Sequence, residues 1–338
     1  MSKINRHPVR RTAAGVLAGA LAFSGAVAAG TPAFAATGFA LERVAGNDRY
    51  ETSASIAAAF GQSTNIILAS GESGRTPDAL AANFLAGVQN APVLLTRRDT
   101  TPEPIMTRLQ TLLAGGATTI TVVGGPVAIS DMQITALRAM GFTVNRVFGA
   151  NRFETAAEVA EAGEGATASN IGLVASGIST IDALSGGPLA FKGRHPLFLV
   201  TRDGVPGATL AAMRATGVTS VIILGGEAVV GADVVSQLAA AGITVRERLA
   251  GADRSETSVA IANRLIADFG FSANTFNLAS GVNEGMDALG GGAALSGKEN
   301  RVLLITNTPI SAAPVMAFAS ARAATLTAAG RIFGGEAA

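Results

Sequence analysis

The 338-residue sequence has no cysteine, no tryptophan, one tyrosine and two histidines. Without cysteine the chain cannot form a disulfide, so a packed core has to stabilise it. One of the histidines, His7, lies in the first few residues, and His195 is the other. A lone histidine without cysteine cannot supply the ligand set of a typical protein zinc site. We therefore expect neither a bound metal nor a cofactor.

Charged residues are few as well, at 14%, against 49% hydrophobic residues, which is enough for a large core. Four of the 25 basic residues fall within residues 1–35, so 21 basic residues remain against 24 acidic ones. A chain with no positive field is not expected to bind nucleic acid, and any anion site has to be local. Beyond residue 35 the only lysines are Lys192 and Lys298. The arginine excess suits recognition of carboxylate or phosphate, and a GC-rich genome would produce it too.

The first 35 residues have the pattern of a secretory signal peptide. A basic start containing Lys3, Arg10 and Arg11 precedes the apolar and small-residue run Ala13–Ala29, and Ala33-Phe34-Ala35 fits a cleavage site. We expect residues 1–35 to be removed on export, which would leave no integral membrane segment.

A ten-residue stretch, Arg43 to Thr52, occurs three times. It reads R-V-A-G-N-D-R-Y-E-T, then R-V-F-G-A-N-R-F-E-T from Arg146, then R-L-A-G-A-D-R-S-E-T from Arg248. Three further motifs repeat in the same order: Ala-Ser-Gly at 69, 175 and 279, Asp-Ala-Leu at 78, 182 and 287, and Gly-Gly at 124, 225 and 334. This recurrence predicts three tandem units, at residues 36–141, 142–242 and 243–338.

Within the first unit, strand and helix patterns alternate. The expected strands are Phe39–Val44, Ile66–Ala69, Val93–Thr96 and Ile120–Val123, and the expected helices are Asp48–Gly61, Asp78–Val88, Pro102–Leu113 and Ser130–Met140. This order predicts an α/β fold with a mainly parallel sheet in each unit, flanked by helices. The third unit ends at Glu336-Ala-Ala, before its fourth helix. Either the reading frame is truncated or this unit leaves part of a sheet face uncovered.

With its triple R-x-x-G-x-x-R-x-E-T signature, the Ser-Gly and Asp-Ala-Leu segment and the closing Gly-Gly, the sequence resembles the cell wall-binding repeat type 2 family. The resemblance implies three Rossmann- or Toprim-like units packed as a pseudo-three-fold array. It also implies a secreted, non-enzymatic anchor at the Gram-positive cell wall or cell surface, which binds an anionic wall polymer of the teichoic or polysaccharide type. Many relatives carry an additional effector domain, for which residues 36–338 leave no room, so we expect the array to be either the whole product or a fragment of a longer one.

The repeated arginines are the first candidate ligand-binding residues: Arg43, Arg49, Arg146, Arg152, Arg248 and Arg254. Three of them, Arg49, Arg152 and Arg254, fall in the first turn of a predicted helix, where a cation opposes the helix dipole. They either form structural ion pairs, for example with Glu51, Glu154 or Glu256, or they join free backbone N–H groups to hold an anion.

The second group of candidates is Asp78, Asp182, Asp287, Ser70, Ser176 and Ser280. The simplest interpretation of the aspartates is that they cap helices. They also follow the carboxyl ends of predicted parallel strands, where open α/β sheets bind their ligands.

Two alternative functions stay open: a peptidoglycan or wall-glycan hydrolase, with Asp182 and Glu227 as acid and base, and a surface adhesin. Catalytic motifs give the hydrolase little support, since no G-x-S-x-G element is present. Gly292 to Lys298 nearly matches a P-loop, but Glu299 follows it in place of Ser or Thr and the segment precedes a strand.

Overall fold

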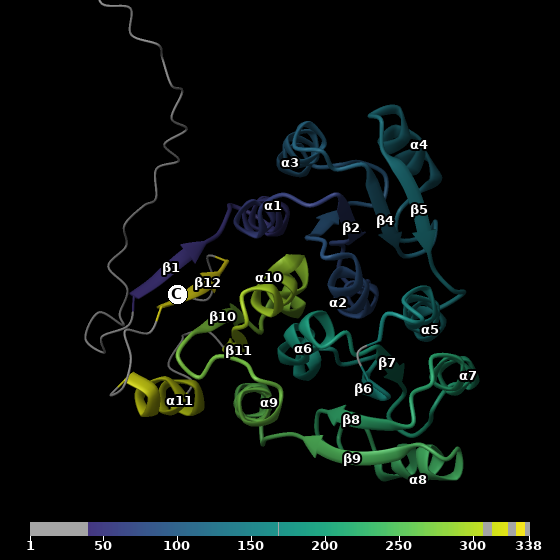
Figure 1. Ribbon diagram of the computed structural model, residues 1–338, viewed down its shortest axis with the longest axis vertical. Helices are drawn as coiled ribbons and strands as arrows, with labels where there is room; N and C mark the ends of the chain where they lie inside the picture. Colours follow the sequence, from purple (N-terminus) through teal and green to yellow (C-terminus); the bar gives the residue numbers. More distant parts are fainter. Residues whose placement is uncertain (1–39, 168, 307–312, 324–328, 335–338) are drawn as a thin grey trace, which may run out of the picture. The chain divides into compact units, whose positions relative to one another are not determined.

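The computed structural model describes residues 40–167, 169–306, 313–323 and 329–334. The predicted signal peptide and the sequence end after Gly334 lie outside the described residues. Three parallel four-stranded sheets with flanking helices form the described part of the chain, which confirms the predicted fold class (Figure 1).

The first two sheets have the same strand order. The first runs β3-β2-β4-β5, with β2 (Asn65–Ser70), β3 (Val93–Thr96), β4 (Thr119–Val123) and β5 (Thr143–Val147). The second runs β7-β6-β8-β9, with β6 (Ile171–Ser176), β7 (Leu197–Val200), β8 (Ser220–Leu224) and β9 (Thr244–Leu249). The two central strands of each are nearly continuous apolar runs, because helices cover both faces of a parallel sheet.

The third sheet combines the two ends of the described chain. It contains β10 (Phe276–Ser280), β11 (Val302–Thr306), β12 (Ala329–Phe333) and β1 (Ala40–Val44), in the order β1-β12-β10-β11. Ala40 is aligned with Ala329 and Val44 with Phe333, in parallel register (Figure 1). Each sheet therefore takes one outer strand from the start of another repeat. This outer strand is β5 in the first sheet, β9 in the second and β1 in the third.

The helices follow the strands at the predicted places. In the first repeat they are α1 (Arg49–Phe60), α2 (Thr76–Gln89), α3 (Glu103–Ala114) and α4 (Asp131–Ala139). In the second they are α5 (Arg152–Ala162), η2 (Ile181–Gly186), α6 (Gly187–Lys192), α7 (Gly207–Ala215) and α8 (Ala232–Ala240). In the third they are α9 (Arg254–Asp268), η3 (Asn283–Gly285), η4 (Ala288–Gly292), α10 (Ala293–Lys298) and α11 (Ala313–Ala323).

The helices α2, α6 and α10, one from each repeat, contact one another pairwise (Figure 1). Glycine allows this close approach: a Cβ atom on Gly87 would lie 2.0 Å from the carbonyl oxygen of Phe191, and one on Gly297 would lie 2.7 Å from that of Pro188. Side chains from all three repeats pack into one continuous apolar core around these helices. The three repeats thus share a core.

Both lysines beyond residue 35 join neighbouring repeats. Lys298 Nζ lies 3.8 Å from the centre of the Phe60 ring and donates to the Phe60 carbonyl at 2.6 Å. Lys192 Nζ lies 4.4 Å from the Phe271 ring and donates to the carbonyl of Gly270 at 2.9 Å. These two cations therefore stabilise contacts between repeats through cation–π attraction and hydrogen bonds to backbone oxygens.

Candidate functional site

The Gly-x-x-Arg-x-Glu-Thr part of the repeated motif builds the turn between the first strand of a repeat and its first helix. In the first repeat, Thr52 Oγ1 accepts from the N–H of Gly46 at 3.0 Å, and Glu51 Oε2 accepts from the N–H of Asn47 at 2.8 Å. Asp48 is the N-cap of α1 and accepts from the N–H groups of Tyr50 and Glu51. The other two repeats use the same bonds, so Glu and Thr are conserved between the copies as turn-closing residues.

The arginine of this motif holds a loop on the neighbouring strand. The Nη1 atoms of Arg49, Arg152 and Arg254 donate to the carbonyl oxygens of Gly71, Gly177 and Gly281 at 2.8, 2.7 and 2.6 Å. The predicted ion pairs with Glu51, Glu154 and Glu256 are wrong, because those carboxylates are occupied by backbone N–H groups of the turn. Each arginine therefore binds a backbone carbonyl oxygen in place of a carboxylate, and one side of its guanidinium faces away from that oxygen.

The first arginine of the motif supports the Gly-Gly loop. Arg43 Nη1 donates to the carbonyl of Gly334 at 2.6 Å, and Arg248 Nη1 donates to that of Gly225 at 2.9 Å. Arg146 reaches the same loop by other atoms, through the Ile129 carbonyl at 2.5 Å and Asp131 at 2.8 Å. These arginines hold backbone in place at the carboxyl ends of the strands.

The three predicted serines lie at the ends of β2, β6 and β10 and are buried. Ser70, Ser176 and Ser280 each accept a hydrogen bond from the N–H two residues later, at 3.3, 3.1 and 3.2 Å. Their hydroxyl groups therefore shape the Ser-Gly loops that the motif arginines also hold.

The aspartates of Asp-Ala-Leu do not cap helices, which corrects the simplest prediction for them. The helix α2 begins at Thr76 with Arg75 at the N-cap, which places Asp78 in the first turn. Asp182 lies inside η2, and Asp287 precedes η4 without a side-chain cap bond. In α2 the helix begins before the aspartate because Thr76 and Pro77 are good first-turn residues.

Each of these aspartates faces the first glycine of a Gly-Gly pair. Gly124, Gly225 and Gly334 have φ values of 124°, 114° and 84°, which favour glycine. A Cβ atom on them would lie 3.2, 3.4 and 1.9 Å from the carboxylate of Asp78, Asp182 and Asp287 respectively. The Asp-Ala-Leu and Gly-Gly motifs therefore recur together because they form one packed contact.

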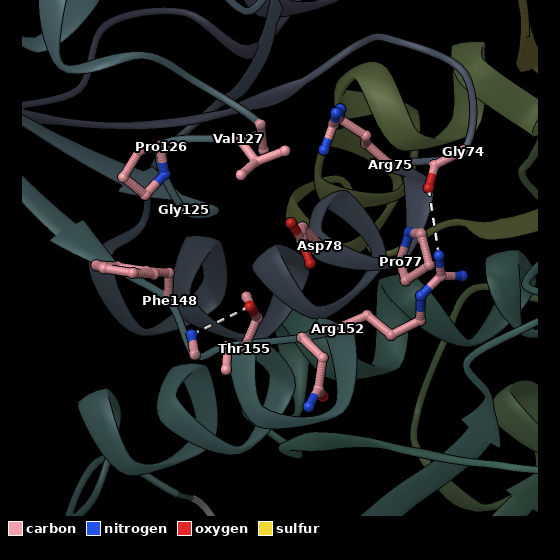
Figure 2. Close-up of a pocket in the computed structure, with 14 residues that line it drawn as sticks. Gly74, Arg75, Pro77, Asp78, Gly125, Pro126, Val127, Phe148, Arg152 and Thr155 are labelled. Atoms are coloured by element: carbon pink, nitrogen blue, oxygen red, sulfur yellow. Dashed lines mark hydrogen bonds between the residues drawn. The ribbon is translucent and has the colours of Figure 1, made fainter.

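At the junction of the first and second repeats this contact opens into a cavity of about 410 Å³. Its walls come from the loop before α2, the Gly-Gly loop after β4 and the start of α5; the lining residues are Gly74, Arg75, Pro77, Asp78, Gly125, Pro126, Val127, Ala128, Phe148, Gly149, Ala150, Asn151, Arg152 and Thr155. Figure 2 shows Arg75, Asp78, Val127 and Phe148 around this hollow. It lies at the carboxyl ends of parallel strands, the edge at which α/β sheets bind ligands.

Charge in the cavity is supplied by Arg75, Arg152 and Asp78. Burial raises the pKa of Asp78 to about 6, against the opposing effect of Arg152 and Arg75. Burial also raises the pKa of Asp182, where Arg254 opposes the shift. Asp78 and Asp182 are thus each influenced by the motif arginine of the next repeat, so these polar groups meet between repeats rather than within one.

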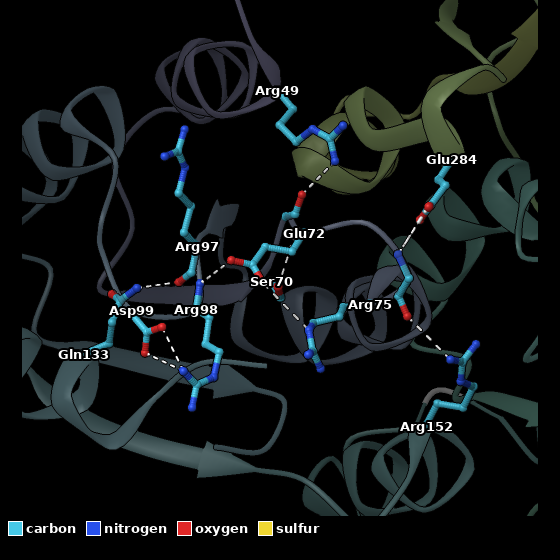
Figure 3. Close-up of polar contacts among 12 residues, drawn as sticks. Arg49, Ser70, Glu72, Arg75, Arg97, Arg98, Asp99, Gln133, Arg152 and Glu284 are labelled. Atoms are coloured by element: carbon cyan, nitrogen blue, oxygen red, sulfur yellow. Dashed lines mark hydrogen bonds and ion pairs between the residues drawn. The ribbon is translucent and has the colours of Figure 1, made fainter. Parts of the chain in front are cut away.

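The Gly74 peptide connects all three repeats at the edge of this cavity. Its N–H donates to both carboxylate oxygens of Glu284, at 3.2 and 3.1 Å, and its carbonyl accepts from Arg152 Nη2 at 3.5 Å (Figure 3). The loop that carries Arg75 is therefore held from the second and the third repeat.

Sequence reasoning found Asp78 and Arg152 but missed Arg75, Val127 and Phe148. A comparison of the three copies could have identified Phe148, because the same position is Ala45 in the first copy and Ala250 in the third. Val127 and Phe148 are large apolar side chains that stay 66% and 44% exposed.

Other predicted features lie away from this cavity. His195 is buried before β7, its Nδ1 atom is 3.0 Å from the Ile171 carbonyl, and burial lowers its pKa. In the described ranges, no three acidic or histidine side chains gather closely enough to hold a metal ion. Of the helices that the structure describes, none has the length and apolar character needed to cross a bilayer.

Relatives of this chain include two proteins of Bacillus subtilis (strain 168). The chain is 28% identical over 268 residues to N-acetylmuramoyl-L-alanine amidase LytC of Bacillus subtilis (strain 168), a match covering 79% of this chain and 50% of the relative. It is 24% identical over 200 residues to the Amidase enhancer of the same organism, covering 59% of this chain and 26% of that protein. The chain thus spans half or less of the length of these relatives.

Solved structures show the same fold. Cwp6 from Clostridium difficile superimposes with a TM-score of 0.76 at 22% identity, over 88% of this chain and 46% of Cwp6. Cwp8 from the same organism superimposes with a TM-score of 0.73 at 24% identity, over 88% of this chain and 50% of Cwp8. The family Cell wall binding domain 2 (CWB2) matches three times, at residues 43–134, 146–235 and 248–338. The chain therefore belongs to the Cell wall binding domain 2 family, with three tandem copies of the domain.

Proposed function

We propose that this protein is exported and holds itself on the Gram-positive cell wall by binding an anionic wall polymer, without catalysing a reaction on it. The observation that carries the proposal is the cavity between the first two repeats, where two arginines and one aspartate meet at the carboxyl edge of a sheet. The three-fold recurrence of the wall-binding domain supports the same function.

Arginine accounts for the preference for an anion. Arg152 uses Nη1 on the Gly177 carbonyl and makes only a long contact of 3.5 Å from Nη2 to Gly74. Arg75 pairs with Glu72 at 3.8 Å, a distance too long for a hydrogen bond. Both guanidinium groups therefore retain N–H donors for a carboxylate or phosphate.

Several weak sites on one polymer would give tight attachment. When one junction of a repeat array is bound, the polymer is held near the others, and avidity multiplies the individual affinities. A polymer with repeated acid groups matches an array with repeated junctions. A wall-anchored position at the cell surface follows from this attachment.

The alternative of a wall hydrolase rests on Asp182 and Glu227. Asp182 packs against Gly225 and faces Arg254, and Glu227 is an exposed residue of the Gly-Gly loop. The amidase activity in the name of LytC belongs to a protein of which this chain covers half. We therefore favour binding over hydrolysis.

Co-sedimentation with purified walls tests the proposal. The protein is expected to pellet with intact walls, to be lost from walls stripped of their anionic polymers, and to be released by salt because salt screens charge pairs. Equal retention on stripped and intact walls would refute anionic binding. Release of soluble fragments from labelled walls would instead support the hydrolase.

A further inference from the structure

The three junctions of the array differ in chemistry, and we infer that the junction between the first and second repeats is the site for an acid-bearing pyranose unit. This inference rests on the proposed function and adds to it a specific cavity and a ligand class. Three positions distinguish this junction: the side chain after the first strand of the next repeat, the residue after Gly-Gly, and the third residue before the aspartate.

At the first of these positions only the second repeat carries an aromatic ring. Phe148 corresponds to Ala250 and Ala45 at the other two junctions. The Phe148 ring packs against Gly125, where a Cβ atom would lie 2.9 Å from it, and Arg146 lies 5.9 Å from the ring centre. The side chain nevertheless stays 44% exposed at the cavity wall. An exposed ring of this kind can contact the C–H groups of a sugar ring.

The second position removes an acid from this junction. Pro126 and Val127 follow Gly-Gly in the first repeat, whereas Glu227 follows it in the second and Glu336 in the sequence of the third. Val127 lines the cavity and is 66% exposed, so it extends the apolar wall formed by Phe148.

The third position adds a cation. Arg75 stands where the other repeats have Ser179 and Glu284. Its side chain is 33% exposed, and within the described residues its only side-chain partner is Glu72 at 3.8 Å. The cavity therefore carries two guanidinium groups and one carboxylate. At the next junction Asp182 is influenced by the charges of both Arg254 and Asp253, and Glu227 follows the Gly-Gly pair there.

These groups suit different parts of one ligand. The acid group would lie on Arg75 and the free side of Arg152, the face of the sugar on Phe148 and Val127, and the hydroxyl groups would donate to Asp78. Among the described residues Asp78 has no hydrogen-bonding partner of its own, although it lines the cavity (Figure 2). A volume of about 410 Å³ lies in the usual range for small-ligand sites.

Two probes separate the contribution of the acid from that of the sugar ring. Titration calorimetry of the mature protein would use an oligogalacturonate, which has both, and poly(glycerol phosphate), which has the acid but no pyranose. The variants are Phe148→Ala, which introduces the residue of the other junctions, and Arg75→Ser. Their matched controls are Ile178→Ala, an apolar loop residue that is 71% exposed, and Arg202→Ser, an exposed arginine beside Asp203.

We expect Phe148→Ala to weaken oligogalacturonate binding about tenfold and to leave poly(glycerol phosphate) binding within about twofold of wild type, whereas Arg75→Ser weakens both about tenfold. Both controls should stay within about twofold of wild type. Melting curves would confirm that the variants are folded. Equal effects of each variant and its control would overturn the inference. The inference would also be overturned if wild-type protein bound intact walls but not oligogalacturonate, and in that case the proposed wall binding would still hold. Equal binding to stripped and intact walls would instead refute the proposed function.

Discussion

Replacing Asp78 by asparagine should make the protein more stable at neutral pH. Burial raises the pKa of Asp78 from an ordinary 3.8 to about 6, so the ionised carboxylate is disfavoured in the folded state. At about 1.4 kcal/mol per pKa unit, this shift corresponds to a cost of roughly 3 kcal/mol at pH 7.5. Asparagine has the same shape and carries no charge, so Asp78→Asn should recover up to that amount.

The stability gained by Asp78→Asn should depend on pH in a predictable direction. The folded state binds the proton more tightly than the unfolded chain, so stability falls as pH rises from 3.8 and levels off above about 6. The advantage of Asp78→Asn should therefore shrink to about 1 kcal/mol at pH 4.5. Urea unfolding at pH 4.5, 6.0 and 7.5 measures this difference.

A suitable control is Glu158→Gln, which removes an exposed carboxylate from α5 that has no hydrogen bond or ion pair within the described residues. It should change the free energy of unfolding by less than about 0.5 kcal/mol at each pH. An Asp78→Asn variant that is no more stable than wild type at pH 7.5, or whose gain does not shrink at low pH, would refute the reasoning. A confirmed gain would mean that the chain keeps this carboxylate at the expense of stability, as binding sites commonly do.

Three further predictions concern contacts between repeats. Gly87→Ala would place a Cβ atom 2.0 Å from the Phe191 carbonyl oxygen and should cost about 1–3 kcal/mol in urea unfolding, whereas Gly207→Ala, with nothing within 4 Å, should be nearly neutral. Lys298→Met removes the cation 3.8 Å from the Phe60 ring and should lower stability by about 1 kcal/mol in the same assay; no change would mean that this contact contributes nothing. A chain starting at Ala45 lacks β1, so hydrogen exchange should accelerate at Gly330–Phe333 but not at Thr119–Val123; unchanged exchange at Gly330–Phe333 would argue against the β1 pairing.

Local signals predicted most of the elements. The strand Val93–Thr96 was predicted with the bounds it has, because Pro92 and an apolar run define it without help from the rest of the chain. The cap at Asp48 and the end at Gly61 were also confirmed for α1. The start of α2 was missed because Asp78 is a good capping residue by sequence, but the helix already begins at Thr76.

Long-range arrangement could not be predicted from the same signals. The strand β1 resembles β5 and β9 in sequence, and nothing local to residues 40–44 indicates that its partner is β12. For the motif arginines the sequence suggests a carboxylate partner or a bound anion, because opposite charges attract, whereas the carbonyl oxygens they bind, such as that of Gly71, become available only when the loops fold. Phe148 is not singled out by the sequence because its exposure depends on Gly125 and on the loop that carries Val127.

Hydroxyl-radical footprinting of the protein on intact walls tests the central claim most directly, because Phe148 is an exposed, oxidisable side chain in the cavity wall. If wall polymer binds at this junction, oxidation of Phe148 should fall strongly when the protein is bound to intact walls. Protein that is bound to intact walls while Phe148 oxidises as fast as in free protein would contradict the account, since the polymer would then lie elsewhere.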